Sequence, residues 1–329
     1  MPTLGPALDA CLLDVPWVSG TLLSPAASRD VTGLMDSLPD AFRCGGLECR
    51  LQGDERVDVV ACAERRQANA LLGAASDSYC GELLQAWLGG QGSTATNMSA
   101  VWIEFDRPAV PVTDTMHRSP WLDAFAFFRV AEAAARRPSR ADVAPLFEAL
   151  GSAFAPAPRE ASKALKAALP ADSRLLHLAA LRHRGRHELR AHIEISARGF
   201  DEYLSVVLKQ DHEKQRLLRH VIGNCRSPLA IQLSSTSNGF QPISVELSLP
   251  HDAAGSAQWD AIFSRLVEVS LASPLKARAV RAWQGTAKHR LLGAPAQVQI
   301  DRLFHVTLRF DAVPAAKAYL YFYPRYVAD

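Results

Sequence analysis

Basic and phenolic side chains alternate with small or apolar ones near the end of the chain. Successive side chains of a β-strand point to opposite faces, so this run would gather an ammonium group and several phenol rings on one face. An ammonium group holds anions, and aromatic rings attract cations. The run therefore predicts a strand whose polar face either meets water or lines an internal cavity. The residues on that face are Lys317, Tyr319, Tyr321 and Tyr323.

Two other stretches, 304–310 and 188–196, sort their side chains in the same way. Each alternates apolar residues, suited to burial, with polar residues that share the opposite face. The polar members are His305, Thr307 and Arg309 in the first stretch and Arg190, His192 and Glu194 in the second. These faces add imidazole, guanidinium and carboxylate groups to the set that could surround a ligand.

Two carboxyl groups lie inside strongly apolar runs. Glu104 follows Val-Trp-Ile, and Glu246 stands between a valine and a leucine. A carboxyl group in such company either faces solvent or has a pKa adjusted for acid–base chemistry. The sequence leaves both interpretations open for each residue.

A metal site is an alternative use of part of this set. His192 and Glu194 would share a strand face, and His305 could approach them across a barrel. Two imidazoles and a carboxylate are a common ligand set for transition metals. A metal-dependent enzyme that uses these residues therefore remains one hypothesis.

Strand-like segments recur in pairs that are separated by turn residues. Two strands joined by a short turn pair antiparallel. The predicted pairs are 42–51 with 57–63, 100–106 with the weaker candidate 110–113, 175–182 with 188–196, 229–235 with 243–249, and 297–310 with 316–323.

Helical periodicity fills the intervals between these pairs. The predicted helical segments are 64–89 with a break near 76–78, 120–137, shorter helices within 140–169, 199–221, and 258–283. The order of helix and strand pair thus repeats about five times, which predicts one α+β domain over residues 1–329. About ten antiparallel strands would close into a barrel surrounded by helices, and a lumen of that width can hold a ligand.

This pattern resembles the ABBA, or PT-barrel, family of aromatic prenyltransferases, which are built from αββα units. The segment from Lys317 to Pro324 is similar to the Lys-x-Tyr strand elements of its indole prenyltransferase branch, although Lys317 and Tyr319 form the only such pair. The resemblance implies transfer of an isoprenyl group from an isoprenyl diphosphate to an aromatic or peptide acceptor inside the barrel. It leaves Mg²⁺ open as a cofactor.

The resemblance also implies roles for the residues named above. The diphosphate would be bound by Arg190, Arg309 and Lys317. The carbocation would be shielded by Tyr319, Tyr321 and Tyr323. The proton would be taken by Glu104 or Glu246, and further candidates for the lumen are His192, Glu194 and His305.

Composition narrows the other possibilities. The chain has 36 Lys and Arg against 34 Asp and Glu, a net charge of +2 that argues against a nucleic-acid binder. No apolar run is long enough to span a membrane, and the six cysteines are scattered without Cys-x-x-Cys pairs, which favours a cytoplasmic protein with reduced thiols. The non-enzymatic alternative is a barrel that binds a small molecule or a peptide. The oligomeric state stays open.

Overall fold

The computed structural model describes residues 2–53, 56–89, 98–106, 119–131, 158–170, 173–183, 186–208, 211–225, 227–236, 239–250, 252–291, 294–310 and 313–327. Its strands are β1 (Cys44–Arg50), β2 (Val57–Glu64), β3 (Met98–Phe105), β4 (Ala124–Val130), β5 (Arg174–His183), β6 (Arg186–Ile195), β7 (Leu229–Thr236), β8 (Gly239–Leu247), β9 (Gly285–His289), β10 (Val298–Arg309) and β11 (Ala315–Tyr326).

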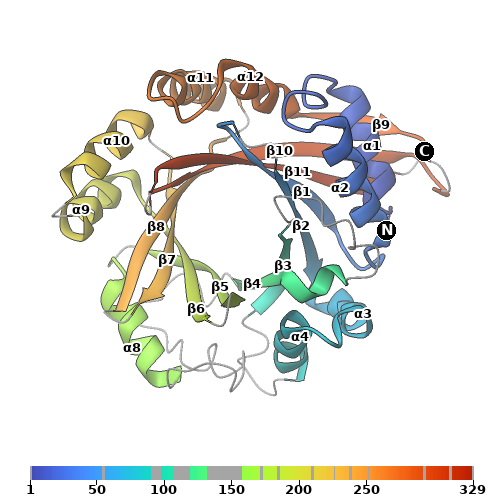
Figure 1. The fold of residues 1–329 in the computed structure, drawn as a ribbon, viewed down its shortest axis with the longest axis horizontal. Coiled ribbons are helices and arrows are strands. Elements are labelled where there is room, and N and C mark those ends of the chain that lie inside the picture. Colours follow the sequence, from blue (N-terminus) through green and yellow to red (C-terminus); the bar gives the residue numbers. More distant parts are fainter. Residues whose placement is uncertain are drawn as a thin grey trace.

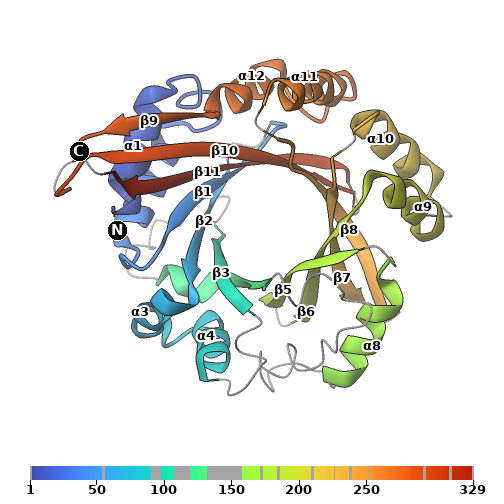
Figure 2. The same ribbon diagram turned by 180° about the vertical axis from the view of Figure 1, so that it is seen from behind.

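Ten of these strands form a closed antiparallel ring. The ring runs from β1 in sequence order to β8, continues through β10 and β11, and closes where β11 pairs with β1. The strand β9 pairs only with β10 and lies outside the ring (Figure 2). The predicted barrel of about ten antiparallel strands is therefore confirmed.

Helices surround the ring on its outer side (Figure 1). They are α1 (Leu4–Asp14), α2 (Pro25–Ser37), α3 (Arg65–Ala75), α4 (Tyr79–Gly89), α8 (Pro158–Ala168), α9 (Ala197–Val207), α10 (His212–Ile222), α11 (Ala253–Glu268) and α12 (Pro274–Trp283). Several begin at a side chain that accepts a backbone N–H of the first turn, which stabilises a helix start by about 1 kcal/mol. These capping residues are Ser24, Ser196, Asp211, Asp252 and Ser273.

The hydrophobic core lies between the ring and the helices. On β11 the outward residues Leu320 and Phe322 are fully buried, and on α12 Trp283 is buried too. The indole Nε1 of Trp283 donates a 2.9 Å hydrogen bond to the backbone oxygen of Tyr321. Burying a side chain of this size contributes roughly 1.5–3 kcal/mol, so the apolar strand faces fix the helices and leave the polar faces for the lumen.

One predicted helix is wrong. The segment 120–137 begins with a short 3-10 helix, Pro120–Asp123, and then becomes the strand β4, which pairs with β3. Aromatic residues at 125, 127 and 128 favour a strand, and a hydrogen-bonded neighbour on each side outweighs the helical spacing of the alanines. The weaker strand candidate 110–113 lies outside the described residues. The strand β3 pairs with β2 on one side and with β4 on the other.

Two further predicted helices are each divided in two: 199–221 forms α9 and α10, and 258–283 forms α12 and most of α11. Of the short helices predicted within 140–169, α8 is present, and residues 140–157 lie outside the described residues. The break predicted near 76–78 separates α3 from α4, and the other four strand pairs form hairpins. The helices α1 and α2 and the strand β9 were not predicted. Within the described residues, no helix is long and apolar enough to cross a membrane.

Candidate active site: a cavity inside the barrel

A cavity of about 780 Å³ lies inside the ring, and side chains from nine of its ten strands line it. This volume falls in the range of small-molecule sites. The cavity exists because the ring is too wide for its inward side chains to fill. The sequence-predicted residues that line it are Glu104, His192, Glu194, Glu246, His305, Thr307, Tyr319, Tyr321 and Tyr323.

Aromatic rings cover one side of the cavity. The imidazole of His305 lies 4.6 Å from the ring centre of Tyr319 and 5.1 Å from that of Tyr321. Tyr319 and Tyr321 are stacked at 6.2 Å, and Trp102 meets Tyr321 edge-on at 5.1 Å. We call these four residues with Tyr323 the tyrosine wall. Ring faces at this spacing can stabilise a positive charge.

A glycine makes room for the centre of this wall. Gly46 on β1 is the register partner of Tyr321. A Cβ at this position would lie 2.7 Å from Tyr321 Cδ1 and 2.9 Å from a methyl group of Val60. Only a residue without a side chain lets the Tyr321 ring lie across the neighbouring strand at this point.

A cluster of charged side chains lies beside Tyr319, at one end of the tyrosine wall. Lys317, 8% exposed, and the hydroxyl of Tyr319 both donate to the carboxylate of Glu48, which has no exposed surface. Arg50 donates to the same carboxylate at 2.7 Å and to Asp58 at 3.3 Å. Burial opposes the ionisation of Glu48, but Lys317 and Arg50 more than offset it and lower its pKa to about 2.

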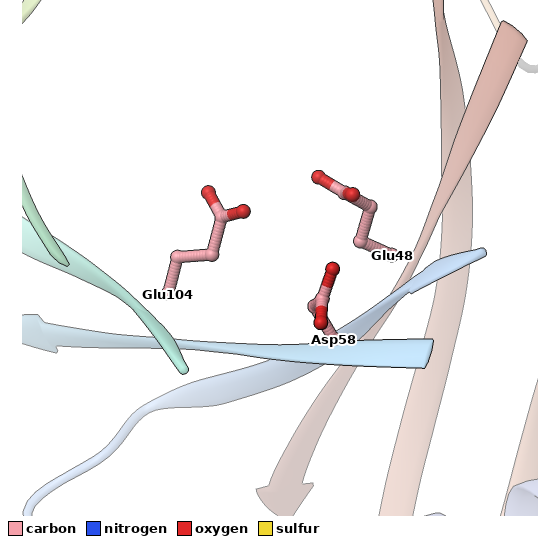
Figure 3. Close-up of side chains that lie close together, drawn as sticks. All are labelled: Glu48, Asp58 and Glu104. Atoms are coloured by element: carbon pink, nitrogen blue, oxygen red, sulfur yellow. The ribbon is translucent and has the colours of Figure 1, made fainter. Parts of the chain in front are cut away.

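Three carboxyl groups converge beside this cluster. Glu48, Asp58 and Glu104 point toward one another (Figure 3), with one oxygen of each within 4.8 Å of the others. Glu104 also lines the cavity. Burial, followed by the negative charge of Glu48, raises the pKa of Glu104 well above its usual value. Glu104 therefore faces the cavity with a raised proton affinity, so that its ionised form is a stronger base than an ordinary glutamate.

The three carboxyl groups do not fit Mg²⁺. The ion prefers six oxygen ligands in an octahedron and retains several waters. Here Lys317 donates to Glu48, and Arg50 donates to both Glu48 and Asp58. These carboxyl groups therefore already have cationic partners from the protein, and no step is assigned to a metal at this cluster.

Glu246 on β8 lies beside the imidazole of His305, on the side of that ring away from the carboxyl cluster in strand order. Its Oε1 atom is 3.5 Å from His305 Nδ1, and its side chain is 25% exposed. Burial lowers the pKa of His305, with Glu246 and Glu48 partly offsetting the effect, so the ring is neutral. Glu246 is thus a second carboxylate beside the tyrosine wall.

The cations predicted to bind diphosphate lie elsewhere. Arg190, Arg309 and Lys317 are not among the residues that line the cavity. Arg190 donates to Glu188 at 2.7 Å, and Lys317 bonds Glu48. The arginines that do line the cavity are Arg129 and Arg174.

Arg129 was missed because β4 was assigned to a helix. As the sixth residue of Ala-Phe-Ala-Phe-Phe-Arg-Val it shares a strand face with Phe127, and both line the cavity. Its side chain is exposed, and within the described parts of the chain it makes no hydrogen bond or ion pair. Arg174, in contrast, is bonded to Glu194 at 3.0 Å.

Polar side chains form a continuous row on the side of the cavity that faces the tyrosine wall. Each member is the register partner of the next, from one strand to its neighbour. The row comprises Arg129 on β4, His177 on β5, His192 on β6, Gln232 on β7 and Ser244 on β8. We call it the histidine row.

The metal hypothesis gains no support from these positions. His192 contacts Gln232, Glu194 bonds Arg174, and His305 lies beside Glu246. Across the described ranges, the only group of three His, Cys, Asp or Glu residues close enough to share an ion is the carboxyl cluster. The three residues of the hypothesis are therefore not brought to one point.

Comparison with known proteins gives a likeness of fold. No protein-family model matches the chain. No curated protein matches it in sequence. The predicted architecture, a closed ten-strand antiparallel barrel with αββα-like order, is confirmed by the strand pairing of this chain. The chain is similar in structure to AnaPT from Neosartorya fischeri, with a TM-score of 0.46 and 12% identity over 85% of this chain and 77% of that one. A similarity of this size carries no information on substrates or activity.

Proposed function

We propose that the protein transfers an isoprenyl group from an isoprenyl diphosphate to an aromatic or peptide acceptor inside the barrel. The observation that carries the proposal is the tyrosine wall, which lines the same cavity as the carboxyl groups of Glu104 and Glu246 and the guanidinium of Arg129. An allylic cation needs π-faces around it, a separate place for the departing anion and a proton acceptor, with water excluded.

In the proposed reaction the isoprenyl group moves from an oxygen of the diphosphate to a carbon of the acceptor. The carbon–oxygen bond of the allylic diphosphate breaks, and the diphosphate leaves with the electron pair. The π-electrons of the acceptor form the new carbon–carbon bond, and the proton from the attacked carbon passes to a carboxylate. Tyr319, Tyr321 and Tyr323 would face the cation, while Glu104 or Glu246 would take the proton.

The diphosphate would lie near Arg129 and Arg174. These are the guanidinium groups at the cavity surface, and guanidinium matches the geometry of phosphoryl oxygens. Arg190 and Lys317 would have to leave Glu188 and Glu48 to reach the anion, and Arg309 is not among the residues that line the cavity. Their assignment to the diphosphate stays a prediction, and Arg129 replaces them as the first residue to test.

Turnover assays test the proposal directly. Purified protein is incubated with dimethylallyl or geranyl diphosphate and a panel of indoles, naphthols and aromatic peptides, with and without Mg²⁺, and both prenylated product and released pyrophosphate are measured. Glu104→Gln and Glu246→Gln should identify the base by a loss of roughly 100-fold or more in kcat. A matched control, Glu268→Gln on the surface of α11, should leave kcat unchanged.

Two results would reject the proposal. The first is the absence of product with every donor and acceptor, in protein whose melting temperature is not raised by any isoprenyl diphosphate. The second is binding of acceptors without any turnover, which would instead support the non-catalytic binding barrel.

A further inference from the structure

The histidine row lies across the cavity from the tyrosines. Within the ten-strand ring, β5 is separated from β11 by five steps in either direction, so His177 stands diametrically opposite the strand of Tyr319 and Tyr321. All five members of the row line the cavity. The row takes no part in the chemistry assigned to the carboxyl groups.

Hydrogen bonds determine which nitrogen of His192 carries the proton. The amide nitrogen of Gln232 lies 2.7 Å from His192 Nε2, and the hydroxyl of Ser244 donates to the amide oxygen of Gln232 at 3.0 Å. An amide nitrogen can only donate, so Nε2 of His192 accepts. Burial, with smaller contributions from neighbouring His177 and Arg190, lowers the pKa of His192 well below its usual value, so the ring is neutral. Its single proton is therefore on Nδ1.

His177 is also neutral with its proton on Nδ1, but for a different reason. Its Nε2 atom is buried and has no hydrogen-bond partner in the part of the chain that the structure describes. A buried N–H without an acceptor is costlier and rarer than a bare lone pair. Burial, with a smaller contribution from Arg129, lowers the pKa of His177 to about 3. The neutral ring therefore carries its proton on Nδ1 as well.

Neither Nδ1 atom is satisfied by the protein. Within the described residues, Nδ1 of His177 and Nδ1 of His192 have no hydrogen-bond partner. Both atoms keep some accessible surface, and since both rings line the cavity, they are accessible from it. Their neighbour Arg129 can only donate as well. This end of the row thus presents hydrogen-bond donors and a single positive charge.

We propose that Arg129, His177 and His192 form an oxyanion subsite that binds a phosphoryl or carboxylate group of a ligand in the cavity. Donors alone have nothing to offer an ammonium or guanidinium group, whereas one cation and two neutral N–H groups match an oxyanion. The inference rests on the proposed function only for the molecule that carries the oxyanion, which is either the diphosphate donor or an acceptor with a carboxylate.

Binding of small probes tests the subsite without requiring turnover. Pyrophosphate represents the donor, indole-3-acetate an acceptor with a carboxylate, and indole a neutral control of the same shape; affinities are measured by calorimetry. We expect His177→Phe to weaken at least one of the two anions about tenfold or more and to leave indole unchanged. Arg129→Gln should weaken the same anion further.

His177→Phe also separates binding from folding. Because the replaced ring has a buried nitrogen without a partner, phenylalanine should keep or raise the melting temperature while it weakens the anion. Arg129 is exposed, so Arg129→Gln provides a second variant with little effect on stability. His220→Gln, at the surface of α10, is the matched control and should change neither quantity.

Each outcome decides the proposal. Weaker pyrophosphate binding assigns the subsite to the donor, and weaker indole-3-acetate binding assigns it to the acceptor. Wild-type protein that binds neither anion, or variants that bind both as the wild type does, would overturn it. Transfer assays on the same variants keep the two proposals apart. Transfer with unaltered anion binding removes the subsite alone, whereas anion binding without transfer removes the proposed function alone.

Discussion

The two sides of the cavity use polar residues in opposite ways. Beneath the tyrosine wall, Glu48, Asp58, Arg50 and Lys317 satisfy one another, and the hydroxyl of Tyr319 is included in the same network. Along the histidine row, neutral rings and one free cation keep hydrogen-bonding groups open toward the cavity. Charged residues thus build and orient the aromatic surface, whereas the groups left for a ligand are mostly uncharged. A cation on the lumen face of a strand is therefore poor evidence for an anion site unless its carboxylate partners are known.

The largest effect should come from Glu48→Gln. The change removes the charge to which Lys317 and Arg50 both donate; the buried Lys317 loses its carboxylate, whereas Arg50 keeps Asp58. Breaking a buried ion pair in this way costs about 3–5 kcal/mol. Urea denaturation measures the loss. A cost below about 1 kcal/mol would show that the charges beneath the tyrosine wall do not hold it.

Stability as a function of pH should distinguish the two sides. The pKa of His177 is lowered to about 3, so the unfolded chain takes up a proton first, and stability falls as pH drops from 6.5 toward 3. The pKa of Glu48 is lowered to about 2, so its contribution is present above pH 4.5 and is lost between pH 4.5 and 2.

The variants His177→Phe and Glu48→Gln should therefore each reduce the pH dependence of stability, but in different pH ranges. In denaturation experiments at a series of pH values, His177→Phe should reduce the slope between pH 6.5 and 3. Glu48→Gln should reduce it below pH 4.5. Equal slopes in His177→Phe and wild type would mean that this imidazole is protonated in the folded protein.

A smaller effect of opposite sign is expected for Glu104→Gln. The pKa of Glu104 is raised, so its stabilising contribution is present at low pH and is lost as pH rises above about 4.5. An amide removes this penalty, so urea denaturation at pH 7 should show a more stable protein. If Glu104 is the base, transfer activity falls in the same variant. A less stable variant at pH 7 would contradict the raised pKa of Glu104.

The smallest effect should be seen at an exposed ion pair. Lys163 and Glu160 lie 3.1 Å apart on α8, with 74% and 64% of their side chains exposed. Such pairs contribute about 0.5 kcal/mol or less, so Lys163→Ala should change the free energy of unfolding by no more than that. A loss comparable to that of Glu48→Gln would invalidate the contrast between buried and exposed charge.

The sequence was sufficient for the barrel and for the aromatic part of its lining on β11. Alternation placed Tyr319, Tyr321, Tyr323 and His305 on one face because period-two patterning is local and needs no knowledge of neighbours. Partners across the ring are not local. The bond between Lys317 and Glu48 joins residues 269 positions apart, so nothing near Lys317 indicates that its charge is used inside the protein.

Arg129 and Gln232 show two further limits. Arg129 lies in a strand whose alanines and flanking residues imitate helical spacing, and the strand becomes apparent only through its pairing with β3 and β5. Gln232 is an ordinary polar residue in an ordinary strand. Its place between His192 and Ser244 depends on register, which a slip of one residue would reverse.

The pairing of β1 with β11, which closes the ring, has a consequence for how the barrel folds. Every other neighbouring pair in the ring except β8 with β10 consists of strands that follow each other along the chain, whereas β1 must wait for a strand about 270 residues later. Contacts at such separation slow folding, because the loop must close before the contact stabilises it. Until then β1 and β11 present unpaired edges, which invite pairing with other chains. The strand β11 carries Lys317 and the three tyrosines of the tyrosine wall. The ring therefore closes in the same step that completes the proposed site.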